Sequence, residues 1–390
     1  MTLETASPMA NRFSLTDDQE LFRRTVREFA EREIAPVAAH FDETEAFPAE
    51  NVRKMADLGL MVLTTPEAYG GAGAGAMEYA LAMEEVARAD AAHSTIMTVN
   101  VSLVSEPLAK LGTDEQRREF LPPLCDGRMV GAYCLSEPSS GSDAADMDTR
   151  AVRDGDEWVI NGTKNFITNG GVAGLYVVYV STDPAQRARG VTAFLVEADR
   201  PGIRAGHKEA KLGIRASPTT QIHLEDCRVP ARNILGQEGQ GFKIAMSTLD
   251  GGRIGVAAQA VGIAQAAFEA ARDYARQRTA FGHPIADFQG LQWMLADMRT
   301  RIEAARMLTW RAAALKDAGQ PHSEEASMAK LFASEAAMWV TTKAIQVHGG
   351  YGYMREAAVQ RYFRDAKITE IYEGTSEIQR LVIARHLLRD

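Results

Sequence analysis

The sequence predicts an α+β fold in which a small β domain lies between two helical domains. Apolar residues recur at helical spacing in the first and last thirds of the chain. Between these thirds lie short runs rich in β-formers, separated by turn residues. We therefore expect an N-terminal α-helical domain over residues 1–130, a middle small β-barrel or sheet domain over 131–237, and a C-terminal helical bundle over 238–390.

Capping boxes mark helix starts in the first zone. Thr16 and Gln19 place a hydroxyl three residues before a glutamine, an arrangement that satisfies free N–H groups at a helix start. The same signature recurs at Thr113 and Gln116. Helical apolar spacing continues through Met77–Arg88 and Thr95–Ala109. We expect this zone to be helical from residue 14 onward.

The middle zone has the pattern of strands and turns. Gly, Asn, Asp and Pro interrupt short runs of β-branched and aromatic residues. These runs are Trp158–Ile160, Leu175–Val180, Val191–Val196 and Gln221–Leu224. Because no helical pattern separates them, an antiparallel sheet or small barrel is favoured over a parallel sheet.

The last zone is rich in alanine and predicts long amphipathic helices. They are expected at Gly241–Arg278, Phe288–Ala318, Ser323–Val347 and Glu377–Leu388. Helices of this length favour a bundle.

Composition limits the classes of function. The chain has 390 residues, of which 46% are hydrophobic and 24% charged, and a net charge of -9. An acidic surface disfavours nucleic-acid binding but allows a small phosphorylated ligand in a local basic pocket. The three cysteines fit structural thiols in a reducing compartment. The first 13 residues lack a secretory signal, and no run approaches the ~18 apolar residues of a membrane span. We expect a soluble, cytoplasmic protein, or a mitochondrial matrix protein in a eukaryote.

Two motifs have ordinary structural explanations. Gly71, Gly73 and Ala76 match GxGxxA, but no strand precedes them, so a flexible loop entering a helix explains them better than a dinucleotide site. His348 precedes two glycines, which fits a helix C-terminus as well as a ligand-binding turn. The eight histidines form no zinc-type pair, so no metal site is expected.

Two other stretches could carry chemistry. Leu135–Asp143 combines turn formers with hydroxyls and free N–H groups, so it could cradle a phosphate or a polar ring edge, or be a plain capping turn. Glu373 lies between an aromatic residue and a glycine, ahead of a helix that Thr375 or Ser376 could cap. A carboxylate in apolar surroundings has a raised pKa and can act as a base. Most glutamates, however, are solvated surface groups.

Six stretches, in the same order along nearly the whole chain, resemble the acyl-CoA dehydrogenase family. They are Tyr133–Asp143, Asn161–Thr168, Leu249–Ile254, Arg278–Gly282, Gln346–Gly352 and Arg364–Gln379. The resemblance implies a helical domain, a small β domain and a four-helix bundle. It also implies FAD-dependent α,β-dehydrogenation of an acyl-CoA to the trans-2-enoyl-CoA, with proton abstraction at carbon two and hydride transfer from carbon three to flavin N5.

The resemblance assigns roles to individual residues. The implied cofactor-binding residues are Tyr133, Leu135, Ser136, Gly141, Ser142, Phe166, Ile167, Thr168, Arg278, Gln289, Gln346, Val347, Gly349, Gly350, Thr375 and Glu377. The implied substrate-binding residues are Ser142, Asp250, Arg253, Tyr372 and Gly374. Arg278 and Gln289 would come from a neighbouring subunit, as in a homotetramer, and would hold the pyrophosphate end of FAD.

Glu373 matches the position of the family's catalytic base. Some relatives place the base before the arginine of the 249–254 stretch, but Gly252 occupies that position here and has no side chain. Glu373 is therefore the only candidate. Electrons would pass to an electron-transfer flavoprotein.

The substrate branch stays open between short straight and 2-methyl-branched acyl chains, hence between fatty acid β-oxidation and branched-chain amino acid catabolism. Ser94–Asn100 and Ala305–Trp310 look like short-chain members, whereas Phe120–Cys125 and Leu249–Arg253 also look like isobutyryl-specific relatives. The alternatives are a flavin monooxygenase or oxidase of related fold, or a non-catalytic flavoprotein. A monooxygenase would not need a carboxylate at 373, and a non-catalytic, DNA-associated relative would need a basic extension.

Overall fold

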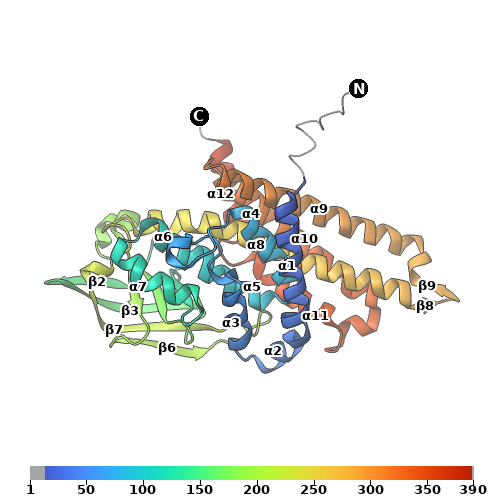
Figure 1. Ribbon diagram of the computed structural model, residues 1–390, viewed down its shortest axis with the longest axis horizontal. Coiled ribbons are helices and arrows are strands. Elements are labelled where there is room, and N and C mark those ends of the chain that lie inside the picture. Colours follow the sequence, from blue (N-terminus) through green and yellow to red (C-terminus); the bar gives the residue numbers. More distant parts are fainter. Residues whose placement is uncertain (1–13, 389–390) are drawn as a thin grey trace.

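The computed structural model describes residues 14–388, which run from helices through a sheet to a second set of helices (Figure 1). The first set comprises α1 Asp17–Phe29, α2 Ala38–Thr44, α3 Ala49–Asp57, α4 Ala76–Ala89, α5 Ala91–Thr98, α6 Glu106–Leu111 and α7 Asp114–Cys125. Both predicted capping boxes are present, at Thr16 on α1 and at Thr113 on α7. The predicted helix over 95–109 is interrupted by a π-helical segment, η6 (Val99–Ser105).

The middle of the chain forms one seven-stranded sheet. Its strands are β1 Gly131–Cys134, β2 Arg150–Asp154, β3 Glu157–Thr168, β4 Leu175–Ser181, β5 Val191–Glu197, β6 Ile203–Lys208 and β7 Thr219–Pro230. Most neighbours pair antiparallel, as expected, but β1 pairs parallel with β4. The hairpin of β2 and β3 lies between these two strands in sequence, and a connection of that length allows parallel pairing.

The last part of the chain is a helical bundle joined by short connections. Its helices are α8 Gly241–Gln277, α9 Gln289–Asp317, α10 Ser323–His348, α11 Ala358–Ala366 and α12 Ser376–Leu387. The helices α8, α9 and α10 pack on one another, α12 packs on α10, and α11 on α8 and α10. The periodicity had not predicted α11, nor the small hairpin of β8 (Thr279–Ala280) and β9 (His283–Pro284).

Helix α8 is the central element of the fold. It runs along the long axis of the molecule, from the sheet to the β8–β9 hairpin (Figure 1), and α4 packs across it. Within residues 14–388 it is the one helix long and apolar enough to span a membrane, although no such run was expected. However, 89% of its most apolar window is buried inside the protein, so it serves as a core helix here.

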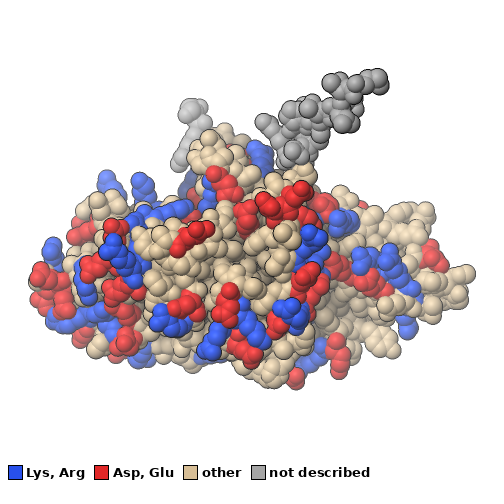
Figure 2. All heavy atoms as spheres, in the orientation of Figure 1, with Lys and Arg blue, Asp and Glu red and all other residues tan. Residues whose placement is uncertain are grey.

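The loop at Gly71–Ala76 leads directly into α4, and 3-10 turns rather than a strand precede it. This arrangement excludes the dinucleotide fingerprint, which requires a strand. All three cysteines are buried and free. The helix α10 ends at His348, and Gly349 follows with a left-handed φ of 59°. Over the face shown in Figure 2, acidic and basic side chains are intermixed.

Candidate active site

The segment that carries Glu373 is a tight loop between two helical turns. It follows η11 (Lys367–Glu370) and ends where Thr375 caps α12 by accepting a hydrogen bond from the Ile378 N–H (3.4 Å). Glu373 and Gly374 are both left-handed, with φ of 53° and 93°. A left-handed glutamate is uncommon and persists only where its surroundings hold it, as at many functional sites.

The carboxylate of Glu373 points toward α8. Its Oε2 is buried and, within residues 14–388, has no hydrogen-bond partner. A Cβ added at Gly252 would lie 3.0 Å from the Glu373 Cδ and 3.1 Å from the Leu103 Cδ2. Gly252 therefore has two consequences for the site. It provides no alternative base, and the absence of a side chain leaves the space that the Glu373 carboxylate occupies.

The acid–base properties of Glu373 follow from this placement. Burial raises the pKa of Glu373 to about 7, while the charges of Lys330 and Arg253 pull it down in part. A carboxylate with a pKa near neutrality is matched to proton abstraction, since it is available as a base and still binds the proton it removes.

Two side chains, those of Lys330 and Gln379, hold the Glu373 loop by hydrogen bonds to its backbone carbonyls. The Lys330 ammonium donates to the Gly374 carbonyl (2.6 Å). The Gln379 amide donates to the carbonyls of Gly374 (2.8 Å) and Glu373 (3.2 Å). Sequence reasoning missed both. The signal for Lys330 was its place on a buried stripe of α10 whose other members are small, among them Ala326, Ser327, Ala333 and Ser334.

Beyond the base, the same face of α8 meets a set of buried polar groups. Gly255 packs against the hydroxyls of Tyr79 and Thr98, which hydrogen-bond to each other (2.6 Å). One turn further, Gln259 accepts a hydrogen bond from the Tyr372 hydroxyl and donates to Thr95 Oγ1 (2.8 Å). We call Tyr79, Thr98, Gln259 and Tyr372 the polar floor. Its Tyr79 and Gln259 had not been predicted.

The loop at 135–143 and the end of β3 come together as expected. The Asn165 N–H donates to the Ser136 carbonyl (2.8 Å), and the Lys164 ammonium donates to the Leu135 carbonyl (3.2 Å). Phe166 is left-handed (φ 56°) and 67% exposed as a residue, an unusual state for an aromatic residue on a sheet. The other predicted residues here divide by exposure: Leu135 and Ile167 are buried, Tyr133, Ser136 and Thr168 are half-buried, and Gly141 and Ser142 are exposed.

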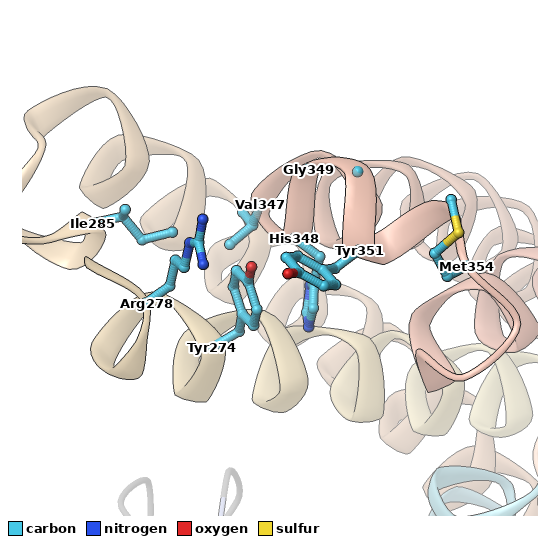
Figure 3. A pocket seen from close by; sticks show the side chains of 9 residues that line it. Tyr274, Arg278, Ile285, Val347, His348, Gly349, Tyr351 and Met354 are labelled. Carbon is cyan, nitrogen blue, oxygen red and sulfur yellow. The ribbon is translucent and has the colours of Figure 1, made fainter. Parts of the chain in front are cut away.

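A second group of predicted cofactor residues lies at the far end of α8. Arg278, Val347, Gly349 and Gly350 line one pocket of about 570 Å³ (Figure 3). His348 stacks on Tyr274 in the same pocket, with ring centroids 4.3 Å apart. The exposed Gln346 and Gln289 belong to the adjacent helix ends. About 39 Å of helix separates Arg278 from Gly252, so the predicted residues form two distant groups within one chain.

The predicted substrate residues Asp250 and Arg253 pair with each other. Arg253 Nη1 lies 2.6 Å from Asp250 Oδ1, and Ser323 Oγ donates to the same oxygen (3.0 Å). Asp250 and Ser323 also line a pocket of about 540 Å³ at the start of α10. Arg253 is buried on α8, next to Gly252, and its charge lowers the pKa of Glu373 in part.

Comparison with known proteins gives one family along the whole chain. Models of the acyl-CoA dehydrogenase N-terminal, middle and C-terminal domains match residues 16–128, 132–227 and 239–388. A short-chain specific acyl-CoA dehydrogenase of Clostridium acetobutylicum is 51% identical over 97% of this chain and 100% of its own.

Two solved structures also resemble this chain over 97% of its length and 100% of theirs. One is the butyryl-CoA dehydrogenase of Megasphaera elsdenii, with a TM-score of 0.95 and 45% identity. The other is described as the electron transferring flavoprotein of Acidaminococcus fermentans, with a TM-score of 0.95 and 48% identity.

Proposed function

The chain belongs to the acyl-CoA dehydrogenase family, and we propose that it dehydrogenates short acyl-CoA substrates with Glu373 as the base. Membership makes it an FAD-dependent oxidoreductase that acts on acyl-CoA. The position of Glu373 Oε2, buried next to Gly252 and without a hydrogen-bond partner within residues 14–388, is the observation that supports the choice of base.

The residues present fit FAD. Phe166 offers an exposed flat ring beside the 135–143 loop, and added Cβ atoms at Gly141, Gly349 and Gly350 would meet open space. Arg278 supplies a cation suited to a phosphate group in the distal pocket. Bound there, FAD would accept the two electrons that leave the substrate. Phe166 with the 135–143 loop would hold the ring system, and Arg278 of a neighbouring subunit would hold the phosphate end.

Glu373 is proposed to take the proton from carbon two of the acyl chain. Within residues 14–388 the Glu373 N–H has no acceptor, so it is free to donate to a thioester carbonyl and to stabilise the negative charge that develops there. The left-handed backbone at Glu373 and Gly374 presents this N–H and the carboxylate from the same residue. Tyr372, fixed by Gln259, would pack beside the acyl chain and position it.

The polar floor supports a short acyl chain. Gly255 and Gln259 follow Gly252 on one face of α8, and their partners Tyr79, Thr98 and Tyr372 fill the space there with hydrogen-bonded groups. A longer chain would have to displace buried hydrogen bonds, which costs free energy. We therefore propose substrates of four or five carbons, straight or 2-methyl-branched.

Two partners follow from the same reasoning. The distance between the base and the Arg278 pocket supports sites completed by a neighbouring subunit, hence at least a dimer, and the family resemblance favours a homotetramer. The likeness to a structure described as an electron transferring flavoprotein supports a protein of that kind as the electron acceptor.

Anaerobic mixing with a panel of acyl-CoAs tests the proposal. Purified protein should be yellow with non-covalent FAD, and butyryl- or isobutyryl-CoA should bleach the flavin absorbance fastest. Rates that rise steadily to twelve carbons would overturn the substrate class alone. Absence of bleaching by any acyl-CoA would overturn the reaction. Light scattering of the same sample should give a tetramer, and a monomer that binds FAD tightly would exclude the shared site.

A further inference from the structure

A buried lysine beside the base is unaccounted for by the proposed reaction. Lys330 is fully buried on α10, and its ammonium donates to the Gly374 carbonyl (2.6 Å). Within residues 14–388, the carboxylates of Glu373, Glu370 and Glu377 act on it through their charge, and none accepts a hydrogen bond from it. An unpaired buried ammonium is costly, so such a residue is retained where its charge or its hydrogen bond has a use.

The hydrogen bond of Lys330 reaches the most strained part of the site. Gly374 and Glu373 are the two consecutive left-handed residues of the base loop. One turn further along α10, Ser334 donates to the Thr369 carbonyl (2.8 Å), so α10 holds this segment at both ends. Gln379 is the second donor to Gly374, but it carries no charge.

The charge of Lys330 faces the base more directly than any other cation nearby. Arg253, the other cation that lowers the pKa of Glu373, is neutralised by Asp250 at 2.6 Å. Of the two further acids near Lys330, Glu370 pairs with Lys367 (2.6 Å) and Glu377 lies exposed on α12. Burial lowers the pKa of Lys330 to about 8, and the charge of Glu373 opposes this, so each charge stabilises the other. The remaining titratable groups near the site are the buried hydroxyls of Tyr79, Tyr133 and Tyr372.

We propose that Lys330 is a positioning residue for Glu373, which pins the left-handed turn through the Gly374 carbonyl and holds the base in its ionised form. The inference rests on the proposed role of Glu373. It assigns two separable effects to one side chain: a hydrogen bond that fixes geometry and a charge that favours the carboxylate. Gln379 supplies the first effect alone.

The comparison of Lys330→Met with Gln379→Met separates these effects. Both variants remove a donor to the Gly374 carbonyl, but only the first removes a charge. The rate constant of flavin reduction in the holoenzyme should rise with pH in wild type as Glu373 loses its proton. In Lys330→Met the midpoint of that rise should move up by about one pH unit, which lowers the rate at pH 7 roughly fivefold beyond any geometric loss. In Gln379→Met the rate should fall at every pH with the midpoint unchanged.

Lys330→Arg should restore the midpoint in part, because the charge returns on a bulkier side chain. Lys367→Met, at an exposed lysine on the neighbouring turn, should change neither rate nor midpoint.

A second readout follows the base without turnover. The carboxyl C=O infrared band that is present in wild type and absent in Glu373→Gln reports the protonated base, and its titration midpoint should move up in Lys330→Met. If both midpoints match wild type in folded, FAD-loaded Lys330→Met, the proposal for Lys330 is wrong. The proposed function still stands in that case if wild type dehydrogenates acyl-CoA. If wild type itself shows no base titration and no bleaching, the proposed function fails, and this inference fails with it.

Discussion

Two fully buried lysines, Lys164 in the sheet and Lys330 in the helical bundle, show how differently one side chain can be used. Lys164 lies 2.7 Å from the buried Glu137 carboxylate, which also accepts from the Thr149 N–H (3.1 Å). Lys330 has a backbone carbonyl as its partner. Burial lowers the pKa of both lysines. The charge of Lys164 is neutralised by Glu137, whereas the charge of Lys330 acts on Glu373.

This difference separates structural from functional use of a buried charge. A pair such as Lys164 and Glu137 contributes geometry: it fixes the start of the 135–143 loop to β3, and its field outside the pair is weak. An unpaired ammonium projects its field onto the nearest titratable group. Loss of Lys164 should therefore be felt mainly in stability, and loss of Lys330 mainly in the chemistry.

The largest effect is expected at Glu373, the group on which the charge of Lys330 acts. Glu373→Gln keeps the size of the side chain but removes the proton acceptor, so flavin reduction by butyryl-CoA should fall by about 10²–10⁴-fold or more. FAD content and acyl-CoA binding should stay near wild type. Glu370→Gln, three residues earlier on the same segment, is the matched control and should keep its activity. Stopped-flow absorbance decides, and a rate for Glu373→Gln close to wild type would mean that the proton leaves by another route.

The next effect concerns the paired lysine. Lys164→Met leaves the Glu137 charge buried without its partner and should lower the free energy of unfolding by about 3–5 kcal/mol. Lys330→Met should cost clearly less, because the Gly374 carbonyl keeps its bond from Gln379. Thermal unfolding at saturating FAD compares the two variants. Adding Glu137→Gln to Lys164→Met should recover part of the loss, and equal losses for both single variants would remove the distinction between the two lysines.

A third effect links the base to stability through pH. The pKa of Glu373 is raised to about 7 in the folded chain, above the ordinary value near 4.5, so the folded state binds more protons between these limits. The contribution of Glu373 to stability is therefore present at low pH and is lost as the pH rises toward 7. Glu373→Gln should be close to wild type in melting temperature at pH 5 and more stable than wild type at pH 8. A difference in melting temperature between Glu373→Gln and wild type that stays constant from pH 5 to pH 8 would show that Glu373 does not titrate in this pH range.

The smallest effect tests whether Thr375 is a helix cap alone or also contacts FAD. Thr375→Ala and Thr16→Ala each remove the side-chain cap of a helix, and each should cost about 1 kcal/mol of stability. If Thr375 also contacts FAD, as the resemblance implies, only its variant should bind FAD more weakly. Flavin release on dilution measures this. Equal FAD affinity in both variants would leave Thr375 as a cap alone.

Local sequence patterns predicted much of the fold because they report local physics. Apolar spacing predicted α4 and the long bundle helices to within a few residues, and hydroxyl caps predicted the starts of α1 and α7. The parallel pairing of β1 with β4 could not be predicted, since it depends on partners 44 residues apart. The domain limits at 130 and 237, the individual cofactor contacts and the cellular compartment stay predictions.

The site divides in the same way. The residues around Glu373 allowed two interpretations, a catalytic base or a solvated surface glutamate. The family resemblance decided between them. Lys330 and Gln259 act through contacts with residues far away in sequence, so no short motif identified them. Gln379 lies within six residues of its partners, inside the 364–379 stretch, but its amide had been given no role. An isolated lysine on a buried stripe of small residues was the one local hint.

The empty position at Gly252 also constrains how such a site can change over generations. A side chain there and a carboxylate at Glu373 would occupy the same volume, since even a Cβ would lie 3.0 Å from the Glu373 Cδ. A side chain at 252 would therefore have to displace the tip of the residue at 373, and Glu373→Gln, which preserves size, would meet a new acid at 252 as wild type does. We expect the base to be relocated most readily when a small residue at 373 accompanies an acid at 252. Loss of the acid at 373 alone should remove the base, so a change of position by single substitutions would pass through a less active protein.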